Sequence, residues 1–149
     1  MILSRTEQQR ELLARSRTIA VVGASPDPDR PSAGVFAYLN ARAGVSAVPI
    51  NPETDVVDGI ATFPTLAAYA AACGAPDIVD VFRKRSLSAH IARAAVAIGA
   101  RSLWFQLGVA DGEALRIADE AGLDVVFDAC IRVEYRRMDE WVADAERPR

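Results

Sequence analysis

Apolar residues gather in two kinds of segment that alternate along the chain from residue 18 to residue 127. Five short runs are apolar almost throughout and rich in β-branched residues, and each is bounded by Gly, Pro, Asp or Asn. Runs of this kind are typical of strands that are buried on both faces, as in parallel sheets. We therefore predict strands at Thr18–Val22, Ser46–Ile50, Asp77–Phe82, Ser102–Phe105 and Asp124–Phe127.

Between these runs the apolar positions recur every three or four residues, which is typical of amphipathic helices. In the segment 86–98, for example, Leu87, Ile91 and Ala95 share one helix face while Arg93 points elsewhere. A glycine follows each of the four helical segments between strands, where a left-handed residue commonly ends a helix. We predict helices at Thr6–Ala14, Gly34–Ala43, Thr65–Cys73, Ser86–Ile98 and Asp111–Ala121, and a polar C-terminal tail from Met138.

Strands and helices that alternate with connections of this length predict right-handed βαβ crossovers and a doubly wound parallel sheet. The strand spacing suggests the Rossmann-like order 3-2-1-4-5 in a single α/β domain over residues 1–149, with its core at about 18–137. In such sheets, ligands bind outside the carboxyl ends of the strands, near the point where the strand order reverses. The five segments that follow the predicted strands are therefore the candidate site.

Composition and charge exclude several functions. The chain has 149 residues, of which 51% are hydrophobic, and a formal net charge of −3. Without an excess of positive charge it is not expected to bind nucleic acid. It has no run of about 20 apolar residues that could span a membrane and no apolar centre of a signal peptide near the start. Two cysteines and one histidine are too few for a disulfide framework or a zinc site. We expect a cytoplasmic, soluble protein without a metal.

The turn after the first strand, Gly23-Ala24-Ser25-Pro26, leads past Arg30 into a helix. Such a turn presents backbone N–H groups to a phosphate, and the helix dipole favours the negative charge. The NAD fingerprint is absent, because Gly23 is the only glycine of the turn and Asn51, not an acidic residue, follows the second strand. The pattern favours phosphate binding without the NAD signature.

Three consecutive cations, Arg83, Lys84 and Arg85, follow the third strand. Cations at a helix N-terminus oppose the helix dipole, so an ordinary solvated helix entry explains them poorly. With Arg30 beside the first turn, they favour a ligand that carries several phosphates. A solvated surface patch is the alternative.

Taken together, these segments resemble the small stand-alone CoA-binding proteins of the CoA-binding domain family, whose fold is also the nucleotide-binding domain of the succinyl-CoA synthetase α chain. The resemblance covers roughly residues 6–138 and lies in five motifs in the same order and spacing. These are Val21–Pro26 with Arg30–Ser32, Val48–Pro52, Asp77–Arg83, Trp104–Gly108 and Ala121–Cys130. The chain departs from the family pattern at Glu53, where a basic residue is common, and at Tyr135, where a histidine often follows a glutamate.

The resemblance implies that coenzyme A, or an acyl-CoA, lies along the carboxyl edge of the sheet. The Gly23–Ser25 loop would hold the pyrophosphate, and the Asn51-Pro52 pair would border the adenosine. The Phe82-Arg83 pair would serve the nucleotide and its phosphates, while Gln106 and Cys130 would face the pantetheine arm. The full set of expected cofactor-binding residues is Gly23, Ala24, Ser25, Pro26, Arg30, Asn51, Pro52, Phe82, Arg83, Lys84, Gln106, Gly108 and Cys130.

Cys130 is the one candidate for covalent chemistry, since it follows the fifth strand with Arg132 close by. A thiolate stabilised by that cation could form a mixed disulfide with CoA, and a half-buried structural cysteine is the alternative. Cys73, at the end of an alanine-rich helix, is expected to pack, and His90 is expected to lie exposed on a helix. With one histidine so placed, no Ser-His-Asp or Cys-His set can be assembled.

We therefore expect a CoA-binding module without a catalytic function, acting as a carrier, a sensor or a subunit. Two alternatives stay open: an NAD(P)-binding Rossmann oxidoreductase, and an acyl-CoA-handling enzyme that uses Cys130 or a partner chain. The sequence leaves open the acyl group, the pathway and the protein partner, which includes the choice between a homodimer and a partner enzyme.

Overall fold

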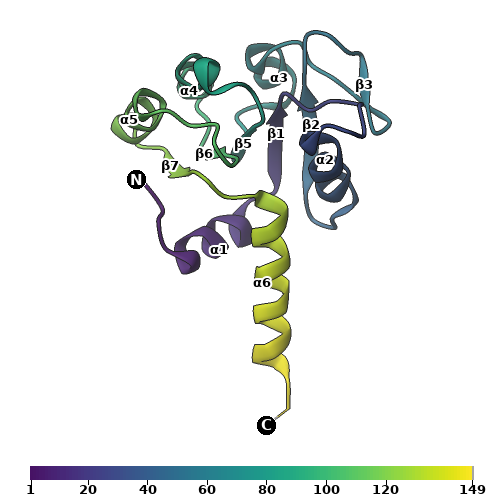
Figure 1. The fold of residues 1–149 in the computed structure, drawn as a ribbon, viewed down its shortest axis with the longest axis vertical. Helices are drawn as coiled ribbons and strands as arrows, with labels where there is room; N and C mark the ends of the chain where they lie inside the picture. Colours follow the sequence, from purple (N-terminus) through teal and green to yellow (C-terminus); the bar gives the residue numbers. More distant parts are fainter. Residues whose placement is uncertain (149) are drawn as a thin grey trace.

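The predicted strands form one five-stranded parallel sheet (Figure 1). The structure, a computed structural model, describes residues 1–148. Its sheet consists of β1 (Thr18–Val22), β2 (Ser46–Ile50), β5 (Ile78–Val81), β6 (Ser102–Phe105) and β7 (Asp124–Val126). All five predicted strands are confirmed, with ends that differ by at most one residue.

Helices occupy the segments between the strands and both ends of the chain. They are α1 (Thr6–Arg15), α2 (Pro31–Ala41), α3 (Leu66–Cys73), α4 (Ser88–Ala97), α5 (Gly112–Glu120) and α6 (Ile131–Glu146). A 3-10 turn at Arg85–Leu87 leads into α4, and a short hairpin of β3 (Val56–Val57) and β4 (Ile60–Ala61) follows β2. The pattern of apolar residues did not predict the hairpin, because its strands have only two residues each.

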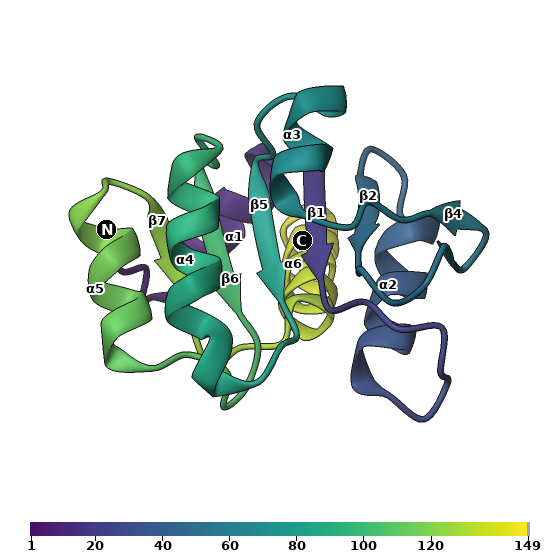
Figure 2. The same ribbon diagram turned by 90° about the horizontal axis from the view of Figure 1, so that it is seen from above.

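The helices cover both faces of the sheet, as expected for a doubly wound fold (Figure 2). Side chains alternate along each strand, so that Ala20 and Val22 of β1 pack towards α3, α4 and α5. Ile19 and Val21 pack on the opposite face, towards α1, α2 and α6. Two apolar cores therefore hold the sheet rigidly between them, and they fix the positions of the loops at the carboxyl ends of the strands.

The strand order differs from the prediction. It is β2-β1-β5-β6-β7, which is 2-1-3-4-5 for the five sheet strands numbered along the chain, rather than 3-2-1-4-5. The carbonyl of Pro49 in β2 points away from β1 and accepts a hydrogen bond from the Phe63 N–H at 3.1 Å. Because the N–H and C=O of a residue point to the same side of a strand, the N–H that proline lacks would also face outwards. Proline suits an edge strand. The next sheet strand, β5, accordingly pairs with the free side of β1.

Irregular segments line both outer strands of the sheet. Phe63 forms an isolated parallel bridge with Ile50 of β2. On the other side, Ile2 forms a parallel bridge with Val125 of β7, and the backbone bonds Leu3 N–H to Val125 O (2.7 Å) and Val125 N–H to Met1 O (2.9 Å) extend this contact. Neither outer strand therefore presents a full row of free backbone groups.

The segment from Met138, predicted as a polar tail, is the second half of α6. No glycine or proline interrupts the chain between Ile131 and Glu146, and the spacing of Ile131, Tyr135, Met138 and Val142 continues one helix face. The helix extends away from the rest of the molecule (Figure 1), so Trp141 is 58% exposed, with Arg10 over its ring. No helix among residues 1–148 is both long enough and apolar enough to cross a bilayer.

Candidate functional site

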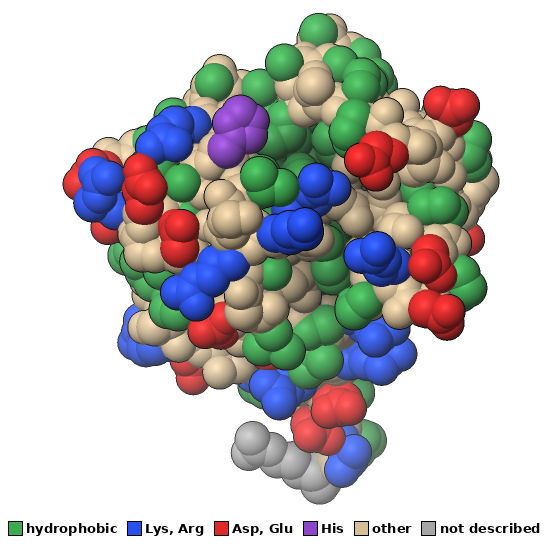
Figure 3. Space-filling view, turned by 45° about the horizontal axis from the view of Figure 1, so that its top comes forward, with side chains coloured by type: hydrophobic (Ala, Val, Ile, Leu, Met, Phe, Trp, Pro, Cys, Tyr) green, Lys and Arg blue, Asp and Glu red, His purple; other side chains and the backbone are tan. Residues whose placement is uncertain are grey.

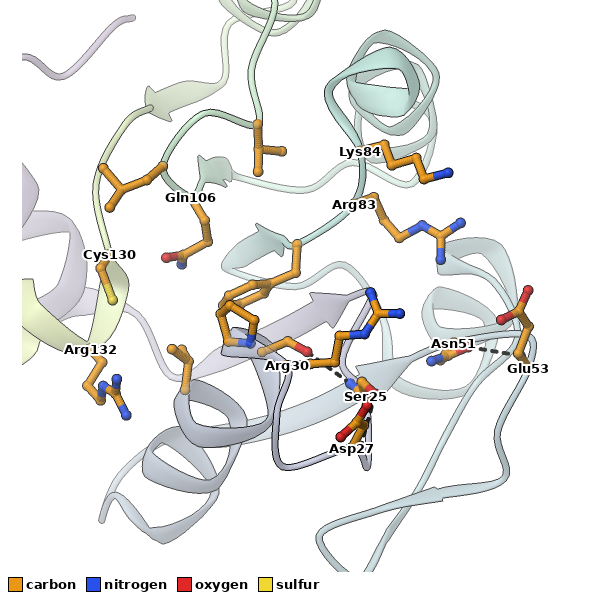
Figure 4. Close-up of a pocket in the computed structure, with 17 residues that line it drawn as sticks. Ser25, Asp27, Arg30, Asn51, Glu53, Arg83, Lys84, Gln106, Cys130 and Arg132 are labelled. Carbon is orange, nitrogen blue, oxygen red and sulfur yellow. Dashed lines mark hydrogen bonds between the residues drawn. The ribbon is translucent and has the colours of Figure 1, made fainter.

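A cleft of about 740 Å³ opens at the carboxyl ends of the strands, beside the point between β1 and β5 where the strand order reverses. Its volume lies within the range of roughly 300–1,000 Å³ that is usual for small-molecule sites. Segments after β1, β2, β5 and β6, together with the start of α6, form its walls (Figure 4). Of the predicted site residues it is lined by Gly23, Ser25, Arg30, Asn51, Phe82, Arg83, Lys84, Gln106 and Cys130.

Four predicted site residues do not line this cleft. Ala24 is fully buried below the first turn, and Pro26 is exposed outside the cleft. Pro52 lines a smaller neighbouring cavity. Gly108 is exposed, and its N–H donates to Oδ1 of Asp128 at 3.0 Å. The cleft also includes residues outside the predicted set, which are Asp27, Pro31, Ser32, Val35, Glu53, Leu107, Val109 and Arg132.

Gly23 marks the closest approach between the first turn and the end of β5. Its φ of 86° lies in the left-handed region, which favours glycine. A Cβ at this position would stand 2.8 Å from Cδ of Arg83. Because Gly23 has no Cβ, the Arg83 side chain can lie directly against the first turn. The two segments that the sequence suggests for phosphate binding, the first turn and the end of β5, are thereby in contact.

Hydrogen bonds within the first turn decide which backbone groups can meet a ligand. The Ser25 N–H donates to Oγ of Ser32 at 3.1 Å, and the Asp27 N–H donates to Oγ of Ser25 at 3.1 Å. Helix α2 starts with Pro31 and has no side-chain cap, and among residues 1–148 the Ser32 N–H has no hydrogen-bond partner. The uncapped start of α2, more than the Ser25 backbone, is therefore the part of this turn that can receive an anion.

Asn51 connects the loops after β1 and β2. Its Nδ2 donates to the carbonyl of Ala24 at 2.8 Å, and its Oδ1 accepts from the Glu53 N–H at 2.8 Å. Both polar ends of the amide are thus engaged within the protein. The side chain lines the cleft, but its hydrogen bonds hold the two loops together.

Four cations line the cleft and give it a positive wall. They are Arg30, Arg83, Lys84 and Arg132, and none of them forms an ion pair within residues 1–148. The acidic residues Asp27 and Glu53 offset part of this charge. Lys and Arg side chains surround a hollow on the face that carries the strand ends (Figure 3). A cluster of unpaired cations in a concave site suits an anionic ligand with more than one charge.

The opposite end of the cleft has a different character, since Gln106, Leu107 and Cys130 line it (Figure 4). Gln106 is buried, whereas Leu107 is 68% exposed. Cys130 is half-buried immediately before α6, and the Nε of nearby Arg132 is buried without a hydrogen-bond partner. This end therefore presents one amide, one thiol, apolar surface and the single cation Arg132.

The second cysteine and the histidine lie away from this end. Cys73 is exposed, which contradicts the expectation that it packs. Helix α3 buries only Leu66 and Tyr69, and Cys73 lies beyond them in the last turn. His90 is exposed on α4, as predicted.

A buried carboxyl group lies directly behind Gln106. Asp80, in the middle of β5, has no exposed surface, and Gln106 Nε2 donates to its Oδ1 at 2.5 Å. Within residues 1–148 its Oδ2 has no hydrogen-bond partner. Burial raises the pKa of Asp80 to about 7, against the opposing effects of hydrogen bonds from the Gln106 side chain and the Val81 backbone. Sequence reasoning missed this residue, although a charge inside the apolar run Ile78–Val81 was a visible signal.

A smaller cavity of about 260 Å³ shares Gly23 and Arg83 with the cleft. Arg83 therefore lies between two neighbouring hollows. Most of the smaller cavity's lining is apolar, and the polar groups among it include Thr65 and His90. The apolar members are Val22, Ile50, Pro52, Pro64, Leu66, Leu87, Ile91 and Ala94.

Comparisons with known proteins give one family and several close relatives. Residues 17–136 match the family described as CoA binding domain. The Bacillus subtilis protein YneT is 35% identical over 126 residues, which cover 85% of this chain and 90% of YneT. A solved structure from Pyrococcus horikoshii OT3 is 35% identical with a TM-score of 0.83, over 90% of this chain and 92% of that one. One from Thermus thermophilus is 32% identical with a TM-score of 0.81, over 90% and 98%.

Proposed function

The chain belongs to the CoA-binding domain family, and on this premise we propose that it binds coenzyme A or an acyl-CoA in the cleft at the carboxyl ends of the strands. The observation that carries the proposal is the composition of the cleft. Three of the four unpaired cations and an uncapped helix start lie at one end, and an amide and a thiol lie at the other, with Arg132 beside them. Coenzyme A has the same polarity, with its phosphates at one end and a thiol at the end of an amide-containing arm.

The phosphates are assigned to the end of the cleft between the first turn and the end of β5. Arg30 and Arg83 border this space, and the free Ser32 N–H opens the first turn of α2 towards an anion. Charge-assisted hydrogen bonds to phosphate are about twice as strong as neutral ones. This group of donors therefore supplies a large share of the binding free energy in the proposal.

The adenosine is assigned to the smaller cavity beyond Arg83. Its lining of proline and aliphatic side chains suits the faces of an adenine ring, and Pro52 lies where the family resemblance puts the adenosine. Arg83 borders both hollows and can therefore meet a phosphate on the ribose between them. This assignment leads us to expect that the 3′-phosphate contributes to affinity.

The pantetheine arm is assigned to the other end of the cleft. Gln106 offers an amide to the arm, and Leu107 and Val109 offer apolar surface. The thiol would then end near Cys130. CoA supplies a thiol that carries acyl groups, and the residues described here bind and orient it, with no catalytic constellation among them.

The main alternative is an NAD(P)-dependent oxidoreductase. In this fold NAD is usually bound through a glycine-rich first turn and an acidic side chain after β2, while NADP is bound with an arginine near the same place. Asn51 occupies this place, and its amide is engaged with Ala24 and Glu53. Glu53 lines the cleft two residues further on, but it follows Pro52, and Gly23 is the only glycine of the first turn, so the site favours CoA. An acyl-CoA-handling enzyme that uses Cys130 or a partner chain remains compatible with the same binding mode.

A thermal-shift series with CoA, NAD and NADP tests the proposal. A ligand at 100 times its Kd stabilises the native state by about 2.7 kcal/mol, which is readily measured as a higher Tm. We expect CoA to raise the Tm and the dinucleotides to leave it unchanged. Arg83→Gln should abolish most of the shift, whereas the matched variant Arg93→Gln, on the outer surface of α4, should keep it. A shift with NAD and none with CoA would overturn the proposal.

A further inference from the structure

Asp80 is a carboxyl group without a counter-ion in the centre of the sheet. It lies on β5, paired in register with Val21 of β1 and Trp104 of β6, and has no exposed surface. Among residues 1–148 no cation forms an ion pair with it. A buried carboxylate without a cation is costly, and an apolar residue would fill the same place without that cost. Its presence is therefore not explained by packing.

In the part of the chain that the structure describes, the side chain that hydrogen-bonds to Asp80 is that of Gln106, which lines the cleft. Gln106 follows β6 and extends into the space beside Cys130 (Figure 4). Its Nε2 donates to the carboxyl group, so its Oε1 is the end left for other partners. Asp80 is thus joined to the ligand site by the amide of Gln106.

The other groups around Asp80 do not replace this partner. From α6, the buried Tyr135 is close enough to interact electrostatically with Asp80, but its hydroxyl forms no hydrogen bond. Arg42, immediately after α2, has its Cζ 4.2 Å from the centroid of the Tyr135 ring and forms its ion pair with Asp139. Among residues 1–148 the Asp80 Oδ2 therefore has no hydrogen-bond partner, and the groups that favour the ionised carboxylate are the Gln106 side chain and the backbone of Val81.

We propose that Asp80 is a positioning residue whose protonation state sets which end of the Gln106 amide faces the cleft, and thereby tunes the binding of the pantetheine arm. The inference rests on the proposed binding of CoA. Under this proposal the affinity of the cleft depends on the protonation of Asp80, a group that does not touch the ligand.

The two protonation states present opposite groups to a ligand. An ionised Asp80 can only accept, so Gln106 must donate Nε2 to it and present Oε1 to the cleft, where an N–H of the arm can donate. A protonated Asp80 can donate its O–H to Oε1, which turns the amide and presents its N–H₂ group to the cleft. Since the pKa of Asp80 is about 7, both states are accessible near neutral pH. Binding of the arm through its N–H should therefore strengthen as the pH rises from 6 to 8.

The first experiment uses the ligand-free protein. The side-chain ¹⁵N–H₂ signals of Gln106 and the ¹³Cγ signal of Asp80 are followed by NMR from pH 5.5 to 8.5. We expect one shared midpoint near pH 7, and no titration of Gln106 in Asp80→Asn. The Asp80 signal needs only the wild type, so a variant that fails to fold leaves the test intact. A Gln106 signal that does not follow the Asp80 titration would overturn the proposal.

The second experiment measures the Kd of CoA at pH 6 and pH 8 in both proteins. The phosphates of CoA titrate identically in each case, so the difference between the proteins isolates Asp80. We expect an extra gain of up to about tenfold in the wild type between the two pH values, the size of one hydrogen bond. Asp80→Asn should lose this gain, and Glu120→Gln, a remote surface variant, should keep it.

If the Kd of CoA changed equally with pH in the wild type and in Asp80→Asn, the proposal that Asp80 controls binding would be overturned. If CoA binds at no pH, the proposed function fails, and the ligand part of this inference fails with it. The NMR titration tests the Asp80–Gln106 coupling without CoA, so the two failures are distinguishable.

Discussion

The two ends of the cleft use charge in opposite ways. At the end assigned to the nucleotide, Arg30 and Lys84 are exposed and Arg83 is half-buried, and their charges face solvent. At the thiol end Arg132 is half-buried beside Cys130, and a second charged group, Asp80, is fully buried behind Gln106. Exposed charges attract ligands over a distance but are screened by salt. A buried one acts over a single hydrogen bond and responds to pH. One binding site thus combines an attractive end with a tunable one.

The largest expected effect concerns the folding stability that depends on Asp80. Its pKa of about 7 in the native state lies above the ordinary value of about 3.9, so the native state binds the proton more tightly than the unfolded chain. This contribution to stability is present below pH 4 and is lost as the pH rises through 7, by about 4 kcal/mol in total. Asp80→Asn should remove that loss, as urea unfolding at pH 4 and pH 8 would measure.

Arg83, at the end of the cleft assigned to the nucleotide, provides the control for this measurement. Arg83→Gln changes a cation that stays charged throughout this pH range, so its stability profile should run parallel to that of the wild type. If the free energy of unfolding of Asp80→Asn changed with pH as it does in the wild type, the contrast between the two ends of the cleft would disappear.

The second effect concerns the 3′-phosphate at the nucleotide end. Dephospho-CoA should bind more weakly than CoA by roughly 1–3 kcal/mol, because a charge-assisted contact with Arg83 is missing. Arg83→Gln should bring the two affinities together, and Arg93→Gln should leave the difference intact, as isothermal titration calorimetry would show. Identical affinities of the wild type for the two ligands would move the phosphate away from Arg83.

The third effect separates backbone strain from the position of Arg83. Gly23→Ala places a side chain at φ 86° and brings its Cβ within 2.8 Å of Arg83 Cδ. Gly44→Ala is a matched control, because Gly44 has φ 80° and its Cβ would meet nothing within 4 Å. Both variants should lose about 1–2 kcal/mol of stability. Only Gly23→Ala should also weaken CoA binding, and a comparable loss of affinity in Gly44→Ala would contradict this account.

The smallest effect is a preference between the two cysteines. Cys73 is exposed and Cys130 is half-buried at the cleft, so a small neutral thiol reagent should label Cys73 faster. CoA disulfide should reverse the order and modify Cys130 by thiol–disulfide exchange, since binding would deliver the ligand's sulfur to the cleft. Peptide mapping by mass spectrometry measures both rates. The same order of labelling with both reagents would make Cys130 a structural residue.

The sequence predicted the strands and the region of the site because both depend on local patterns. Continuous apolar runs located β1 and β5, and small or charged residues after them located the cleft at Gly23 and Arg83. The spacing of the strands did not predict their order. The signal for it was Pro49, which lacks a backbone N–H and therefore suits β2 to the edge of the sheet.

Other features of the site arise only from tertiary contacts. Whether Asn51 faces a ligand or connects two loops depends on the carbonyl of Ala24, 27 residues away along the chain. The contact of Asp80 with Gln106 joins β5 to the segment after β6, and the two residues are 26 positions apart in the sequence, so no local pattern reveals it. Arg132 was noted beside Cys130, but its place in the cleft follows from the packing of α6.

The segments beside β2 and β7 also affect how the molecule behaves among other chains. A bare outer strand can recruit a strand from another molecule, which is the first step of many ordered aggregates. Phe63 occupies part of the outer side of β2, where Pro49 offers no donor, and the backbone of Met1–Leu3 occupies part of the outer side of β7. Strand addition on either side would first have to displace a bonded segment. Crowding should therefore leave this sheet at five strands, so that concentrated samples resist fibril growth as long as both segments stay in place.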